Sequence, residues 1–415
     1  MTRRRKTTRR SNKVRRNKGR NKSQRDSIPK PIVMSTERPL AGFAAERCST
    51  IDTHVRVEMC GFHTFDEGLA FYKMLEAFDP FLQNCRVRAS SVESVLVVST
   101  QGKSYVYLNN SLPIIGRMRV KRACGKGEAI SRDDVADIAQ LEFPGIIPPD
   151  KAGFLFLISA GWRRGICFDF RALTPNTQVS SRDSFEFVKR LGGIVLAHLL
   201  FTEKFLLTPD DWAKVISVGW FPFICLPINL WESLFDAIKN EENTEEQEDQ
   251  IHHFLLGVLT DRFISWSKNK HIQTHVSFLS DAVDAYKNGK WAICISSALP
   301  RIEGMLRQAF GAMTGKNAAV MEAMQEKLSQ REHSRSLLFP EKLRDYFETV
   351  LYPYTTFNDS DLPATRHTHA HGLVEYERLG RKQALTLLLL IDHIMYCLPM
   401  SGLRDSEARP FESTR

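Results

Sequence analysis

The C-terminal half of the fold follows from the stretch Trp291-Ala-Ile-Cys-Ile-Ser-Ser-Ala-Leu-Pro-Arg-Ile-Glu-Gly-Met-Leu-Arg-Gln-Ala309. Its apolar side chains recur at spacings of 4, 3, 4, 3 and 4, the period of one face of a helix. They are Trp291, Ile295, Ala298, Ile302, Met305 and Ala309. Such a stripe predicts a helix that packs inside a helical bundle. Pro300 interrupts it and is expected to free the carbonyl of Ser296 and bend the helix.

Three further helices are predicted around this one. Residues 278–287 have helical spacing and end at Asn288-Gly289, a helix stop signal. A third helix is expected at about 340–352, and a fourth from near Gly372 to about Leu398. We therefore expect an all-α four-helix bundle over residues 266–402, followed by a flexible tail at 403–415.

Strand signals fill the N-terminal part of the chain. Residues 54–59 alternate in polarity, and 92–99 and 104–108 are apolar runs joined by a Gln101-Gly102 turn. A helix is expected at 65–82. Together they predict a small α/β module at 46–130.

A middle region is expected at 131–265. Residues 131–134 resemble a helix start, and the apolar runs 154–160 and 166–170 predict a β-hairpin whose tip carries Trp162, Arg163 and Arg164. An exposed aromatic ring beside two guanidinium groups suits a base and a phosphate, although hairpin tips are commonly only solvated. Beyond Asp183 the pattern is helical. The predicted fold class is therefore α+β.

Basic charge is concentrated at the N-terminus. The first 30 residues hold 14 Lys and Arg against one acid, a charge of +13 within a chain of +9, so the other 385 residues carry −4. The basic run from Arg3 to Arg16 has almost no apolar residue, and residues 1–45 are expected to be a disordered tail that attaches to RNA or another polyanion. A solubilising leader is the alternative. The arginines expected to contact nucleic acid are Arg3, Arg4, Arg5, Arg9, Arg10, Arg15 and Arg16.

Compartment signals favour the cytoplasm. The eight cysteines are scattered singly, as is typical of buried thiols in a reducing compartment. The longest apolar run, 384–400, contains Asp392 and His393, which favours a helix of a soluble bundle over a membrane span. The acidic run 241–249 is expected to be an exposed helix end or linker that also holds the basic tail when no nucleic acid is bound.

The strongest chemical signal is Arg366-His-Thr-His-Ala-His-Gly372. An imidazole exchanges protons near neutral pH, and a guanidinium binds phosphate through paired hydrogen bonds. If a helix begins at Gly372, its exposed N–H groups also favour an anion there. Glu303, on the helix over 291–309, is expected either to orient Arg366 or His371, or simply to pair with Arg307.

This motif resembles the signature of the HEPN superfamily, Arg-x(4 to 6)-His at the start of the last helix of a four-helix bundle. The sequence supplies the four-residue spacing in Arg366 to His371, and the helix pair 285–307 is similar to the first half of HEPN-like modules in bacterial proteins. The resemblance covers about 130 of the 415 residues.

The resemblance implies metal-independent RNA cleavage by a homodimer, with no cofactor and a defence or toxin role. His371 would transfer the proton, Arg366 would stabilise the transition state, and His367 would assist positioning. The products would be 2′,3′-cyclic phosphate and 5′-hydroxyl ends.

Two other functions stay open. His367, His369 and His371 have a spacing that suits a metal-dependent hydrolase, although no further ligands are readable. Alternatively, the bundle is a non-catalytic scaffold that dimerises and binds RNA through the basic tail.

Overall fold

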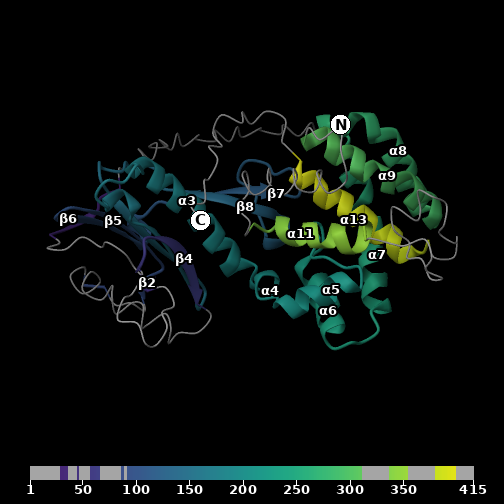
Figure 1. Ribbon diagram of the computed structural model, residues 1–415, viewed down its shortest axis with the longest axis horizontal. Helices are drawn as coiled ribbons and strands as arrows, with labels where there is room; N and C mark the ends of the chain where they lie inside the picture. The colour runs from purple at the N-terminus through teal and green to yellow at the C-terminus, as the bar shows by residue number, and fades with distance from the viewer. Residues whose placement is uncertain are drawn as a thin grey trace, which may run out of the picture.

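The computed structural model describes residues 29–35, 44–45, 57–65, 86–87, 91–310, 336–353 and 379–398. Over these residues the fold is α+β, as predicted, with antiparallel strands first and helices after them. Figure 1 shows the main sheet at one end of the long axis, helices α7, α8 and α9 at the other, and strands β7 and β8 between them.

The main sheet has six antiparallel strands in the order β1-β6-β5-β9-β10-β4. The strands are β1 (Ile32–Ser35), β4 (Cys60–Phe65), β5 (Ser94–Thr100), β6 (Lys103–Leu108), β9 (Gly153–Ala160) and β10 (Arg163–Asp169). The predicted strand pairs 92–99 with 104–108 and 154–160 with 166–170 are thereby confirmed as hairpins. The short strands β2 (Ala44–Ala45) and β3 (Val57–Glu58) pair separately.

Both faces of β9 are buried, which explains its unbroken apolar sequence. Phe154 and Phe156 pack toward helix α3 (Ser181–Leu200), whereas Leu155 and Leu157 belong to the core on the opposite face. Gly165 of β10 lets α3 come close, because a Cβ there would lie 2.2 Å from Val195 Cγ1.

A second sheet connects the strands to the helices. β7 (Ile115–Val120) pairs with β8 (Val135–Glu142), and β8 packs on α3. Val135, Ala136 and Ile138 of β8 belong to the same continuous core as the helices that follow. Residues 131–134, predicted to start a helix, form a single 3-10 turn before β8 instead.

The remaining described elements are helical. They are α4 (Thr202–Phe205), α5 (Pro209–Ser217), α6 (Ile228–Lys239), α7 (Glu245–Trp266), α8 (Val276–Lys287), α9 (Trp291–Phe310), α11 (Pro340–Tyr346), a π-helical turn (Phe347–Leu351) and α13 (Arg381–Cys397). α9 packs against α8 and α13, and α7 also packs against α8 and α13. Ile295, Ala298, Ile302 and Met305 of the predicted stripe are buried, whereas Trp291 and Ala309 at its ends are half-buried. The helix continues through Pro300.

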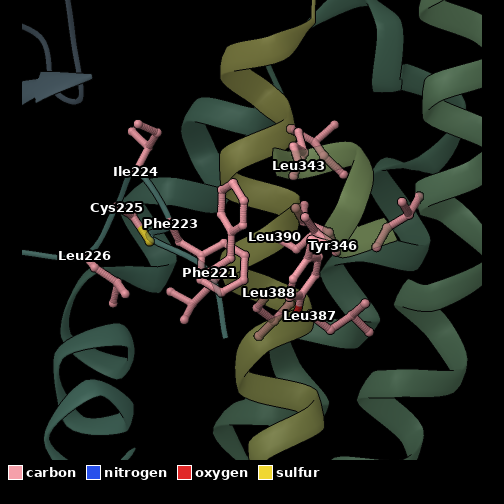
Figure 2. Close-up of a cluster of buried hydrophobic side chains, with 14 of the residues drawn as sticks. Phe221, Phe223, Ile224, Cys225, Leu226, Leu343, Tyr346, Leu387, Leu388 and Leu390 are labelled. Atoms are coloured by element: carbon pink, nitrogen blue, oxygen red, sulfur yellow. The ribbon is translucent and has the colours of Figure 1, made fainter. Parts of the chain in front are cut away.

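Residues 219–223 form an aromatic connector between α5 and α6, and its side chains fill the centre of the helical region. Phe221 and Phe223 pack against Tyr346 of α11, with ring centroids 5.6 and 5.8 Å apart. Figure 2 shows these rings beside Leu387, Leu388 and Leu390 of α13. Trp220, Phe221 and Phe223 of this segment are fully buried.

The last helix begins later than predicted. Gly380 is its N-cap in extended conformation, and α13 starts at Arg381 rather than near Gly372. Leu379 and Gly380 are not helical, so the apolar stripe from Ala384 onward marks the helix correctly but not its beginning. The predicted helix at 65–82, apart from Phe65 of β4, and the first half of the predicted strand at 54–59 lie outside the described residues.

Candidate functional site

The three catalytic candidates Arg366, His367 and His371 lie outside the described residues, as do the seven tail arginines from Arg3 to Arg16. In the sequence, the motif is not next to the start of α13. Because α13 begins at Arg381, its N-terminal N–H groups lie ten residues beyond His371 in sequence. The expectation that the motif forms the edge of this helix is therefore wrong.

Glu303 lies on α9, and its described partner is Arg307. The Oε1 atom accepts a hydrogen bond from Arg307 Nε at 2.8 Å, and both side chains are mostly buried. This is the i, i+4 pair that the sequence offered as one interpretation of Glu303. The other interpretation, orientation of Arg366 or His371, stays a prediction.

Charged side chains join α7 to the first turn of α13. Lys382 Nζ lies 2.8 Å from Glu248 Oε1, and Arg381 forms an ion pair with Asp249. Two basic residues at a helix N-terminus oppose the helix dipole, so these carboxylates offset an unfavourable placement. The end of the acidic run 241–249 therefore binds α13.

One helical turn further along α7 is a pair of histidines, of which His252 packs on Tyr286 of α8 and Trp291 of α9 while His253 is exposed. His252 Nδ1 lies 2.7 Å from the hydroxyl of Tyr286, and the rings of His252 and His253 are 5.6 Å apart. Burial lowers the pKa of His252, and the charges of Arg381 and His253 lower it further. His252 is therefore mainly neutral at pH 7 and is able to accept a proton.

The hairpin tip between β9 and β10 is exposed, as predicted. Trp162 keeps 67% of its surface accessible, and the Arg163 guanidinium carbon lies 5.0 Å from the centre of the Trp162 ring. Arg164 donates to the carbonyl of Gly161 at 2.6 Å. The turn is shorter than predicted, because Arg163 already pairs with Ala160 in the sheet.

A buried polar network joins α7 and α13 to the β7–β8 hairpin. Trp266 Nε1 donates to Asp392 Oδ1 at 2.7 Å, and Arg262 donates to the Tyr396 hydroxyl at 2.7 Å and to the Lys121 carbonyl at 2.8 Å. Asp392 is almost fully buried. Each donor here meets an acceptor on another element, so the network fixes how these elements are packed.

Lys204 of α4 lies close to this network. Only 3% of Lys204 is exposed, and its amine makes no hydrogen bond or ion pair within the described ranges. Burial, followed by the charge of Lys121, lowers the pKa of Lys204 to about 7. A buried amine without such a partner is costly to keep charged.

Sequence reasoning missed both the histidine pair of α7 and the buried network around Asp392. A signal for the histidine pair was present, since the adjacent acids Glu248 and Asp249 lie three to five residues before His252 and His253 on one helix. No local signal links Lys121 or Lys204 to α13, because their contacts join segments far apart in the chain.

No family model, curated protein or solved structure matches this chain. Among the described residues, no cluster of His, Cys, Asp and Glu has the geometry of a metal site. Within those same residues, no helix has both the length and the hydropathy of a membrane span.

Proposed function

We propose that this protein is an endoribonuclease that cleaves RNA without a metal ion, using Arg366 and His371. The Arg366-x4-His371 motif carries the proposal. The packing of α8, α9 and α13 against one another supports it, because the resemblance that assigns the motif requires helices of this kind in contact.

The chemistry follows from the residue types. His371 takes the proton from a ribose 2′-hydroxyl or gives one to the leaving 5′-oxygen. Arg366 stabilises the negative charge that develops on the phosphorus oxygens, and His367 helps to position the phosphate. The 2′-oxygen attacks phosphorus as the bond to the 5′-oxygen breaks, which leaves a 2′,3′-cyclic phosphate and a 5′-hydroxyl. A homodimer would bring two such motifs together.

Three features would hold the RNA. The basic tail supplies non-specific attraction to phosphates, and Arg163 and Arg164 supply guanidinium groups at the hairpin tip. Trp162, stacked on Arg163, offers an exposed ring to an unpaired base. These groups would bind the RNA, and the Arg366-x4-His371 motif would cleave it.

The test is cleavage of end-labelled RNA by the full chain, with and without EDTA. We expect Arg366→Ala and His371→Ala each to lower the rate by about 100-fold or more. His369→Ala is the matched control from the same segment and should cleave normally. Cleavage that persists in both alanine variants, or that EDTA abolishes, would exclude the proposed site.

A non-catalytic RNA-binding scaffold is the second candidate. The observation that favours it is the Glu303–Arg307 pair, since a carboxylate that neutralises its neighbour on the same helix needs no catalytic role. The scaffold predicts salt-sensitive RNA binding through the tail, with no cleavage by any form of the protein.

A further inference from the structure

Lys204 of α4 brings a primary amine into the interior without giving it an acceptor. Only 3% of the residue is exposed. Within the described part of the chain the amine makes no hydrogen bond or ion pair. Its Nζ atom keeps some accessible surface, unlike the sealed indole nitrogens of Trp220 and Trp231. A small molecule from solvent can therefore reach this amine.

Hydrogen bonds at the 3-10 turn Arg132–Asp134 bring distant segments of the chain together beside Lys204. The first residue of the turn pairs at 2.7 Å with Glu203, the neighbour of Lys204 in the sequence. The second accepts the Ile228 N–H at 3.0 Å, and the carbonyl of the third accepts the Lys121 N–H at 2.7 Å. The turn therefore fixes Lys121 and Lys204 in one neighbourhood.

Lys121 is a second amine without an acceptor. The residue is half-buried, and its amine makes no hydrogen bond or ion pair among the described residues, although its carbonyl accepts from Arg262 at 2.8 Å. Burial lowers the pKa of Lys121. Burial, followed by the charge of Lys121, lowers the pKa of Lys204 to about 7. The two ammonium groups repel each other, so a large share of Lys204 is neutral at pH 7.

The other titratable groups nearby offer neither amine an acceptor. Three are carboxylates that already have partners, namely Glu203 with Arg132, Asp133 with the Ile228 N–H, and Asp392 with Trp266 and Arg262. The remaining two are Cys225 and His393. Burial raises the pKa of the Cys225 thiol and lowers that of His393, so both are neutral near pH 7.

A neutral lysine beside another cation is a nucleophile toward small electrophiles. The small exposed surface of Lys204 excludes bulky electrophiles, whereas CO₂ is a linear molecule of three atoms. Addition of CO₂ turns the amine into an anionic carbamate. This change replaces the repulsion between Lys204 and Lys121 by attraction, and it gives Lys121 the acceptor that it lacks.

We propose that Lys204 is a modification site at which CO₂ adds to the amine, and that the resulting carbamate pairs with the amine of Lys121. The lone pair of Nζ attacks the carbon of CO₂, an N–C bond forms, and one electron pair of a C–O bond moves to oxygen. The nitrogen then releases one proton to water, so amine and CO₂ give carbamate and H⁺. No oxidant or metal ion takes part.

The modification would join two parts of the fold. Lys121 directly follows β7, and α4 lies between α3 and α5 (Figure 1). A Lys204 carbamate paired with Lys121 would therefore link the β7–β8 hairpin to the start of the helical region. The inference concerns Lys204 alone and does not depend on RNA cleavage.

The test is trapping of carbamates on the full chain at about pH 7 under ¹³C-labelled CO₂. Triethyloxonium ion converts a carbamate into a stable ethyl ester, and peptide mass spectrometry then locates the labelled carbon. We expect the label on Lys204 and about tenfold less or none on Lys214, an exposed amine paired with Glu241. No label on Lys204 at saturating CO₂, or equal labelling of Lys214, would overturn the proposal, whether or not any variant folds.

A second measurement follows the carbamate resonance by ¹³C NMR as the CO₂ concentration rises. Lys204→Met should lose the resonance. Lys121→Met should bind CO₂ about tenfold more weakly, as expected for the loss of one hydrogen bond to a charged group. Lys214→Met is the matched control and should behave as wild type. An unchanged CO₂ affinity in Lys121→Met would overturn the proposed pairing.

Discussion

His393 of α13 is buried between two backbone groups. Its Nδ1 accepts from the Ile224 N–H at 3.3 Å, and its Nε2 lies 3.0 Å from the Leu338 carbonyl oxygen, to which it donates. Burial lowers its pKa to about 3. The imidazole thus links the segment after the aromatic connector to the segment before α11 through hydrogen bonds. Its role is structural and not that of an acid or base.

This arrangement makes the fold sensitive to acid. Between pH 6.5 and 3 an unfolded histidine binds a proton that folded His393 does not, so the free energy of unfolding falls as pH drops. We expect a decrease of up to about 1.4 kcal/mol per pH unit below 6.5. Urea unfolding at several pH values measures it. His393→Gln should reduce the slope, whereas His253→Gln on the exposed face of α7 should not; equal slopes in all three forms would count against this account.

Lys204 makes the free energy of unfolding depend on pH above neutrality. Its folded pKa of about 7 lies below that of an unfolded lysine, so between the two values the unfolded chain binds more protons and stability rises with pH. We expect a gain of about 2 kcal/mol in unfolding free energy from about pH 7 to about pH 9. Lys204→Met should abolish the gain, and exposed Lys214→Met should retain it. A gain that survives Lys204→Met would show that another group is responsible.

At the scale of elements, glycine determines how closely α3 approaches β8. A Cβ on Gly193 would lie 2.8 Å from the backbone Cα of Gln140, and backbone cannot yield as a side chain can. Gly193→Ala should therefore destabilise the fold by about 1–3 kcal/mol. Gly257 of α7 has open space, so Gly257→Ala should stabilise by up to about 1 kcal/mol. Chemical denaturation of both variants checks the pair, and similar effects from the two would refute the close-packing argument.

Elements with strong local patterns were predictable. The β5–β6 and β9–β10 hairpins, the C-terminal stop of α8 and the buried stripe of α9 all follow from periodicity and turn residues. By contrast, Ser131 and Asp134 have the capping chemistry of a helix start but cap one 3-10 turn, since capping satisfies any turn of exposed N–H groups.

Elements that depend on distant partners were not predictable. β4 pairs with β10 across about 100 residues, and the N-terminus of α7 meets α13 through side chains more than 130 residues apart. For the candidate site, sequence alone supplied the motif at 366–371 and both interpretations of Glu303. The buried network of Arg262, Trp266 and Asp392 needed the folded chain, because its contacts join segments far apart in the sequence.

At the scale of the whole molecule, charge is divided between a basic segment and a mildly acidic remainder. If the segment binds RNA, replacing Arg3, Arg4, Arg5, Arg9, Arg10, Arg15 and Arg16 by Gln should weaken binding and flatten its salt dependence. Each phosphate that the variant no longer neutralises should reduce the steepness of log K against log salt by about 0.7 for a single strand. Fluorescence anisotropy at several salt concentrations measures the slope. An unchanged slope would mean that RNA binds elsewhere, for example at the hairpin tip.

The central claim is that cleavage needs the ribose 2′-hydroxyl and no metal ion. The most direct measurement is the chemical identity of the RNA ends that the full chain produces in the presence of EDTA, determined by mass spectrometry. The account predicts 2′,3′-cyclic phosphate and 5′-hydroxyl ends, and no cleavage of a 2′-deoxy substrate. Ends bearing 3′-hydroxyl and 5′-phosphate, or cleavage of the deoxy substrate, would contradict it.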